Sequence, residues 1–214
     1  MPSILNLTAP TLKDYTKENI IATWSGVEAG YVNDPNDRGG ETNHGVTIAT
    51  ANQYRAALII KFGWSGQMRD LTAEMAYYIY DLGWWQPMRC DDLLAVHPFV
   101  CDRVFDLAIN GGRTLGVKTL QRILNACNRQ GKDYADIGVD GGIGTLTLNA
   151  LKGYVAKRGY DGVNVLVQYQ FSLQGAHYIE LAEKDPTQEN FVNGWGDRIT
   201  KINALYQRVL LNSK

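Results

Sequence analysis

Apolar residues recur at helical spacing along most of this chain, and glycines separate the periodic segments. Ile20, Trp24 and Val27 are spaced by four and three residues, which puts them on one face of a helix. The same periodicity recurs in most later segments, so the chain is expected to fold as a mainly α protein. The pattern predicts helices over 50–60, 72–82, from Pro98 through Leu107, and over 114–127, 145–152, 163–183 and 197–211.

One stretch near the N-terminus breaks this pattern. The first helix is expected to start at the capping-box pair Thr11 and Asp14 and to stop at Gly30. Turn-forming pairs then follow at 34–35, 36–37 and 39–40. Short strands at 31–32 and 42–46 are expected to form a small β-hairpin near residues 31–46, the one β element of the fold.

Charge and cysteine content exclude several classes of protein. The net charge is −1, which gives no support for nucleic-acid binding. Cys90, Cys101 and Cys127 have no C-x-x-C spacing and are expected to be buried free thiols. The N-terminus lacks the pattern of a signal peptide, and no apolar run is long enough for a transmembrane helix.

The histidines and the acidic loops do not predict a metal site. The three histidines, at 44, 97 and 177, are not paired at metal-ligand spacing. A calcium loop starting at Asp34 fails because Arg38 and Gly45 occupy ligand positions. We therefore expect no metal and no other cofactor.

Two carboxylates near residue 30 differ in their expected surroundings. Glu28, in the last turn of a packed helix, is partly desolvated and faces the negative end of the helix dipole, and both effects favour the protonated form. Asp37 follows nine residues later in a polar loop and is expected to stay ionised. Two carboxyl groups in such different environments are typical of glycoside hydrolases, in which one is protonated and the other ionised. The alternative is a solvated helix end followed by turn-forming aspartates.

The stretch around these carboxylates matches a known signature. EAGYVNDPNDRGGETNHGVT, at 28–47, resembles E-G-G-Y-x-x-D-P-x-D-x-G-G-x-T-x-x-G-I-T of glycoside hydrolase family 108. That family comprises N-acetylmuramidases of bacteriophage endolysins and bacterial lysozyme-like proteins. Segments 105–125 and 139–151 resemble its predicted peptidoglycan-binding region, and FVNGWGDRI at 191–199 resembles its closing element. Ala29 and Val46 depart from the signature, which leaves the backbone geometry after Glu28 open.

The resemblance implies a mainly α, lysozyme-like fold that hydrolyses the β-1,4 bond between N-acetylmuramic acid and N-acetylglucosamine. Residues 1–100 would carry the glycosidase, and 101–214 a peptidoglycan-binding-like region packed with it as one compact unit. Glu28 matches the essential glutamate and is the expected general acid. Asp37 is the preferred second carboxylate, with Glu41 as the alternative, and Thr42 is expected to position water.

Substrate-binding residues are expected around the same loop and on nearby aromatic side chains. Sugar rings present C–H faces that rest on aromatic rings, while their hydroxyls seek polar groups. Asp34 is expected to contact substrate or to hold the loop as an Asx turn. The other expected contacts are Tyr31, Glu41, His44, Trp84, Trp85 and Asn110, and Tyr77, Tyr78, Tyr80 and Trp195 are further aromatic candidates.

Three other functions fit parts of the sequence: a non-catalytic wall-binding protein of the same fold, a chitinase, and a zinc-dependent amidase or peptidase. The expected partner is the peptidoglycan glycan strand, with no nucleic acid and no stable membrane association. The resemblance to endolysins implies a monomer that accumulates in the cytoplasm of the producing host cell. It would reach the wall after a separate holin-like protein permeabilises the membrane.

Overall fold

Helices make up 73% of the computed structural model, which describes residues 3–26, 29–33 and 40–212. Short helical turns connect the longer helices at Ile4–Asn6, Leu12–Asp14, Met68–Asp70, Asp81–Trp85 and Pro186–Gln188. The main elements are α1 (Lys17–Trp24), β1 (Thr42–Asn43), β2 (Val46–Thr47), α2 (Ile48–Gln53), α3 (Arg55–Phe62), α4 (Ala73–Tyr80), α5 (Cys90–Val96), α6 (Pro98–Gly111), α7 (Arg113–Cys127), α8 (Thr145–Lys184) and α9 (Glu189–Asn212).

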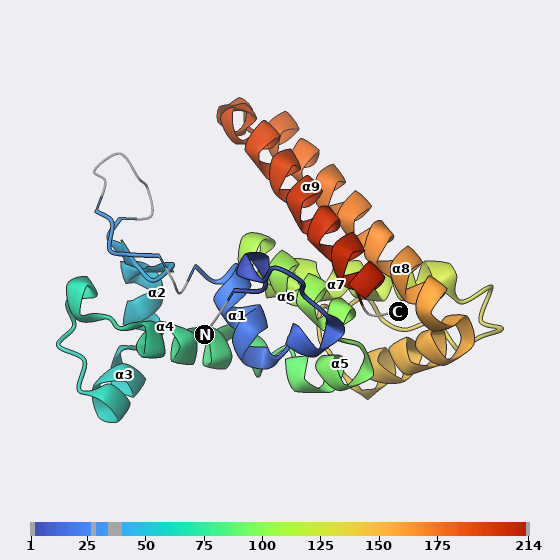
Figure 1. Ribbon diagram of the computed structural model, residues 1–214, viewed down its shortest axis with the longest axis horizontal. Coiled ribbons are helices and arrows are strands. Elements are labelled where there is room, and N and C mark those ends of the chain that lie inside the picture. Colours follow the sequence, from blue (N-terminus) through green and yellow to red (C-terminus); the bar gives the residue numbers. More distant parts are fainter. Residues whose placement is uncertain (1–2, 27–28, 34–39, 213–214) are drawn as a thin grey trace.

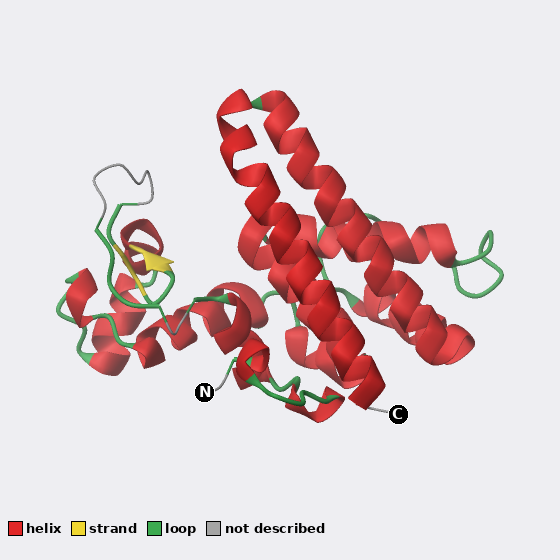
Figure 2. Cartoon of the chain, turned by 45° about the horizontal axis from the view of Figure 1, so that its top comes forward, coloured by secondary structure: helices red, strands yellow, loops and turns green. Residues whose placement is uncertain are grey.

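These elements form three parts that follow one another in space (Figure 1). The hairpin, α2 and α3 lie at one end, and α4 leads from them to the middle of the molecule. The middle contains α1 and α6, beside α5 and α7. The second part of α8 and α9 form an antiparallel pair that projects from the body, as both views show (Figures 1 and 2).

The central helix is α6. Pro98 occupies its first turn, where the missing N–H costs nothing. Every residue from Phe99 to Ala108 is buried, and the helix packs against α1, α5, α7 and α8. A helix that is buried all round lies in a core, so α6 joins the N-terminal and C-terminal halves of the chain.

The first helix is shorter than predicted at both ends. Thr11 and Asp14 do form a capping box, but it closes a single 3₁₀ turn. The helix itself begins after Thr16, whose hydroxyl accepts the N–H of Asn19. It ends at Trp24, and Gly26 takes a left-handed conformation with φ of 70°. The predicted stop at Gly30 is therefore wrong, because a glycine four residues earlier provides the positive φ.

The predicted hairpin is confirmed, with a turn inside its second segment. Val32 and Thr42 exchange backbone hydrogen bonds of 2.8 and 2.9 Å. The chain then turns back at His44 and Gly45, both with positive φ, so that β1 pairs with β2. Positive φ at both central residues is typical of a type I′ hairpin turn, so 42–46 is not one continuous strand.

Later helices occur where periodicity predicts them, with different ends. Thr47, not Thr50, caps the helix at 48, and Tyr54 separates α2 from α3. The predicted helices 145–152 and 163–183 are the two parts of α8, which meet at Gly159 (φ 58°, ψ −150°). The helix predicted at 197 begins eight residues earlier, at Glu189. The prediction of a mainly α fold with one small β element is confirmed.

The cysteines are free thiols, as predicted. Cys90 and Cys101 are buried, and Cys127 is half-buried. Within the described ranges, no helix is long and apolar enough to cross a membrane.

Candidate active site

A cavity of about 390 Å³ opens between the C-terminal end of α1 and one face of α9. Thr23, Trp24 and Gly26 line its α1 side, and Arg198 and Lys201 line its α9 side. Leu5, Gly194 and Ile202 complete the lining. The cavity therefore combines an aromatic ring with two cationic side chains, at the point where the chain leaves α1.

The hairpin turn is fixed directly against the end of α1. A Cβ added to Gly45 would lie 2.0 Å from the carbonyl oxygen of Ser25, so only glycine fits there. The hydroxyl of Tyr80 on α4 donates to the Gly45 carbonyl at 2.7 Å. The Ser25 hydroxyl donates at 2.5 Å to the Ile21 carbonyl, which also accepts the Ser25 backbone N–H at 3.0 Å. The hairpin, α1 and α4 thus meet at this turn.

Two polar side chains hold the rest of the hairpin. The buried amide of Asn43 donates to the carbonyls of Met68 and Leu71, at 2.8 and 3.1 Å. The hydroxyl of Thr47 accepts the N–H of Thr50 at 3.2 Å and so caps α2. These bonds therefore fix β1 to the segment 68–71 and β2 to the start of α2.

A buried carboxyl lies behind the Trp24 ring. The indole Nε1 of Trp24 donates to Oδ1 of Asp102 at 2.5 Å. Burial raises the pKa of Asp102 to about 7, although the indole N–H and the nearby Arg103 act against it. This contact links the end of α1 to the central helix α6.

Asp106, one turn further along α6, is the centre of a buried ion-pair network. Arg103 donates to it at 2.8 Å, and Arg198 of α9 forms a second ion pair with it. Arg103 also donates to Gln174 of α8 at 2.6 Å. Burial alone would raise the pKa of Asp106, but the two guanidinium groups outweigh it and hold the pKa below its usual value. The guanidinium of Arg198 also lies 5.2 Å from the centre of the Trp24 ring.

Three of the predicted site residues, Glu28, Asp34 and Asp37, lie outside the described residues. Four others cluster on the hairpin. The Thr42 hydroxyl donates to the Gly40 carbonyl at 3.3 Å. Tyr31 lies under the guanidinium of Arg69, 4.1 Å from the ring centre. Glu41 and His44 are half-buried in the same segment.

The two predicted tryptophans have different environments. Trp84 is half-buried and packs against Tyr80, with ring centres 5.4 Å apart, so it lies next to the side chain that holds the hairpin turn. Trp85 is fully buried, donates to Asp91 at 2.8 Å and packs against Phe105. The prediction that Trp85 contacts substrate is wrong in this structure, because its ring belongs to the core. Tyr80 is buried in the same way.

Asn110 is exposed at the end of α6, where its amide donates to the carbonyl and the carboxylate of Asp106. Its contact with the cavity is thus indirect, through Asp106 and Arg198. Among the residues that the structure describes, no group of three or more His, Cys, Asp or Glu is arranged to hold a metal ion.

Sequence patterns do not predict the α9 side of the cavity. Arg198 belongs to the G-W-x-x-R part of the segment 191–199, which marks the family but does not indicate that this side chain lies near α1. Gly194 and Arg198 are four residues apart and share a face of α9. Lys201 follows on that face, and no sequence pattern singled it out.

Comparisons with known proteins agree with this architecture. Residues 21–112 match the family model described as Glycosyl hydrolase 108, and residues 115–200 match the one described as Predicted Peptidoglycan domain. A solved structure of Brucella abortus SagA is 27% identical over 93% of this chain and 98% of that chain, with a TM-score of 0.60. No curated protein sequence matches the chain significantly. The resemblance seen at 28–47 is confirmed, and with it the mainly α, lysozyme-like class of fold. The boundary expected at residue 100 stays a prediction.

Proposed function

The chain is a glycoside hydrolase of family 108 that acts on peptidoglycan and carries a peptidoglycan domain, and on that basis we propose that it is an N-acetylmuramidase. It would hydrolyse the β-1,4 bond between N-acetylmuramic acid and N-acetylglucosamine, with Glu28 as the general acid.

The observation that carries the proposal is the cavity at the end of α1. Gly26 lines this cavity, and Glu28 is the second residue after it in the sequence. Glu28 is also the carboxylate that matches the essential glutamate of the family signature. The contacts of Gly45 with Ser25 and Tyr80 hold the hairpin beside this point, as a site that positions substrate requires.

In the proposed mechanism, Glu28 protonates the glycosidic oxygen as the bond breaks. Asp37 then stabilises the oxocarbenium-like charge or activates a water from the opposite face, with Thr42 positioning that water. Glu41 is the alternative second carboxylate. A carboxyl separation of about 5 Å would give retention of configuration, and about 6.5–9.5 Å would give inversion.

The cationic wall of the cavity favours a muramidase over a chitinase. Peptides attached to N-acetylmuramic acid carry carboxylates, whereas chitin is uncharged. Lys201 provides an exposed cationic group on the wall that faces Gly26, next to Arg198, which already pairs with Asp106. Arginine and lysine form charge-assisted hydrogen bonds with carboxylates.

The first experiment is digestion of purified peptidoglycan by the wild type and by Glu28→Gln. New reducing ends are reduced with borohydride and identified by mass. We expect the wild type to release fragments ending in reduced N-acetylmuramic acid and Glu28→Gln, with an unchanged circular dichroism spectrum, to release almost none. Equal cleavage by both proteins would show that Glu28 is not the general acid. Products ending in reduced N-acetylglucosamine would refute the assignment of the bond that is cut.

A second comparison tests the cationic wall. Lys201→Gln is expected to raise KM for peptidoglycan fragments that carry peptides about threefold to tenfold, a loss of roughly 1 kcal/mol. The rate on N-acetylglucosamine oligomers, where measurable, should not change. Lys152→Gln, an exposed lysine on α8 that does not line the cavity, is the matched control. Equal effects of the two variants would argue against a role for Lys201.

The cellular setting is proposed by analogy with endolysins. The protein would accumulate as a monomer in the cytoplasm of the producing cell, and a holin-like protein would give it access to the wall. Co-expression with and without a membrane-permeabilising protein tests this, since lysis should require both proteins and an intact Glu28.

A further inference from the structure

A groove runs between α7 and α8, within the residues that match the peptidoglycan domain. It consists of two adjoining cavities of about 380 and 350 Å³, which share Ala126, Cys127 and Tyr169 in their walls. One side comes from residues 122–129, at the end of α7 and just beyond it, and the other from residues 154–173 of α8. Arg198 and Lys201 do not line it, so the groove is distinct from the cavity at the end of α1.

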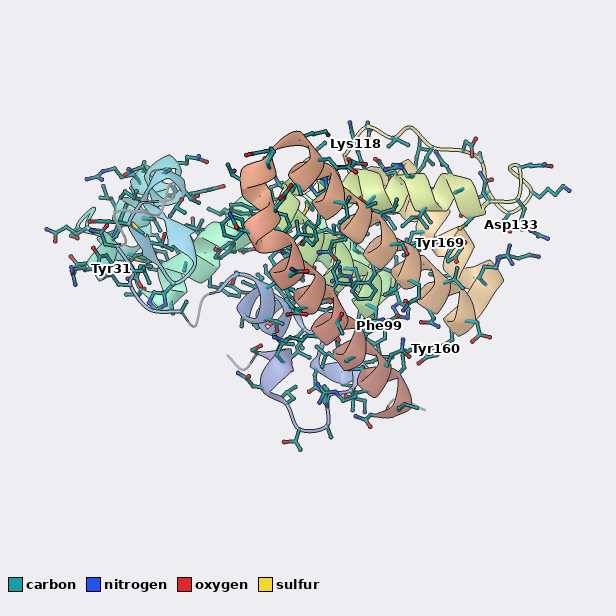
Figure 3. All side chains as sticks on the ribbon, turned by 90° about the horizontal axis from the view of Figure 1, so that it is seen from above. Tyr31, Phe99, Lys118, Asp133, Tyr160 and Tyr169 are labelled. Atoms are coloured by element: carbon teal, nitrogen blue, oxygen red, sulfur yellow. The ribbon has the colours of Figure 1, made fainter. Side chains whose placement is uncertain are left out.

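The α8 wall of the groove presents apolar groups that are unusually exposed. Gly162, Val165, Tyr169 and Ser172 recur at spacings of three and four residues, so they form one stripe of the helix. Half of the Tyr169 surface is exposed, as is 45% of Val165. Figure 3 shows Tyr169 and Tyr160 at separate places along α8. The exposed ring of Tyr169 provides a flat apolar surface of the kind on which a sugar ring rests.

The rim of the groove is cationic. Arg122 lines one cavity, and Arg129 and Arg158 line the other. Arg129 and Arg158 share one carboxylate, that of Asp133, and Arg122 has no ion-pair partner within the described part of the chain. Asp161 is the one acidic residue of the lining. The groove therefore has a surplus of guanidinium groups, which bind carboxylates well because their geometry is planar and bidentate.

We propose that this groove is a second peptidoglycan-binding site, which holds a glycan strand away from the bond being cut. A sugar ring would rest on Tyr169, and carboxylates of the attached peptides would bind Arg122 and the Arg129–Arg158 pair. The inference rests on the proposed function to the extent that peptidoglycan is the substrate. It adds where on the C-terminal half the polymer would be held and which side chains would hold it.

Binding to purified peptidoglycan sacculi tests the groove. The full chain carrying Glu28→Gln is the parent, and the bound fraction is measured by sedimentation. Tyr169→Ala and Arg122→Gln should each weaken binding about fivefold, which corresponds to roughly 1 kcal/mol. Tyr160→Ala, an exposed tyrosine of the same helix, and Arg113→Gln, an exposed arginine of α7, are the matched controls and should bind within twofold of the parent.

Hydrolysis is measured separately, so the two proposals fail in different ways. With Glu28 intact, the groove variants should cleave short soluble glycan fragments at the wild-type rate. If the groove variants bind sacculi more weakly but no protein releases muramidase products, the binding role of the groove stands and the proposed reaction is refuted. If Tyr169→Ala and Arg122→Gln bind sacculi as tightly as the parent, or if the two controls lose as much binding, the proposal that the groove binds peptidoglycan is refuted.

Cys127 provides a second readout, because it lines both cavities while Cys90 and Cys101 are buried. Peptide-bearing muropeptides should slow labelling of Cys127 by an uncharged maleimide, and N-acetylglucosamine oligomers should slow it much less. Equal protection by both ligands would refute the carboxylate contacts. Protection by neither would overturn the site itself.

Discussion

At the scale of single residues, the candidate active site depends on two glycines and one buried carboxyl. Gly26 and Gly45 both have positive φ, and they lie so close that a Cβ on Gly26 would be 3.3 Å from the Gly45 Cα. Asp102 lies near them and accepts a hydrogen bond from the indole N–H of Trp24. These groups determine how the end of α1 meets the hairpin turn, so their substitution should affect both stability and activity.

Gly45→Ala should lower the free energy of unfolding by about 2–4 kcal/mol, since positive φ and a clash with Ser25 add together. The natural comparison is Gly63→Ala at the end of α3, where φ is 68° and no atom lies within 4 Å of the added Cβ. That substitution should cost only about 1–2 kcal/mol. Urea denaturation of both variants measures the difference. If Gly63→Ala costs as much as Gly45→Ala, the close contact with α1 is not what requires glycine.

Asp102 should give the protein an unusual dependence of stability on pH. Its pKa is about 7 when folded and 3.8 as the ordinary value, so the folded state binds more protons between these values. Stability from this group is complete below about pH 4 and is lost as pH rises through 7, by up to about 4 kcal/mol. Asp102→Asn should therefore lose less stability than the wild type between pH 5 and pH 8.

Thermal melts at several pH values measure this effect of Asp102. A second, half-buried group, His97, changes stability with pH in the opposite direction. Burial lowers the pKa of His97 to about 4, so neutral His97 adds stability as pH rises from about 4 to 6.5. This contribution is common to both proteins and cancels in their difference. Parallel pH profiles for Asp102→Asn and the wild type would mean that Asp102 is ionised throughout.

At the scale of elements, sequence periodicity predicts the existence of helices better than their ends. The segments 72–82 and 114–127 lie within one or two residues of α4 and α7, because capping threonine and glycine residues delimit them. The predicted C-terminal end of α1 is wrong, because Gly26 and Gly30 are both suitable stops. Only the tertiary contact with Gly45 selects Gly26. Trp85 was predicted as a ligand contact, because composition does not tell a groove aromatic from a core aromatic. Arg198 and Lys201 approach α1 only through the three-dimensional fold.

The break inside α8 belongs to this scale. Gly159 has φ of 58° and ψ of −150°, a combination that is essentially restricted to glycine. Gly159→Ala should lower stability by about 1–3 kcal/mol, even though nothing lies within 4 Å of the added Cβ. Gly196→Ala, in the middle of α9 and equally uncrowded, should instead raise stability by about 0.5–1 kcal/mol. Opposite shifts in melting temperature are the expected result, and two shifts of the same sign would contradict it.

At the scale of the whole molecule, the buried network around Asp106 connects the two halves of the chain. It brings together α6, α8 and α9, and the Trp24–Asp102 contact extends it to α1. The family match to the glycosidase ends within this arrangement, at residue 112, and the match to the peptidoglycan domain begins three residues later. Substitutions in this network should therefore destabilise both halves of the chain.

Asp106→Asn should lower stability by about 3–5 kcal/mol, because Arg103 and Arg198 would lose their shared counter-charge in a buried site. The exposed pair Arg89–Asp92 offers a matched control, and Asp92→Asn should cost no more than about 0.5 kcal/mol. Chemical denaturation followed by tryptophan fluorescence measures both losses. Similar losses for the two variants would show that the Asp106 network contributes no more than a surface ion pair.

The position of α9 also affects how the protein is made. Arg198 contacts Asp106 across 92 positions of sequence, and Tyr206 packs against Phe99 in a tilted arrangement with ring centres 3.9 Å apart. A ribosome releases α6 long before it releases α9, so the central helix must wait for the second guanidinium that pairs with Asp106 and for the ring that packs on Phe99. Contacts between such distant segments form late and slowly. The half that matches the glycosidase family thus reaches its folded form only after the half that matches the peptidoglycan domain has been synthesised.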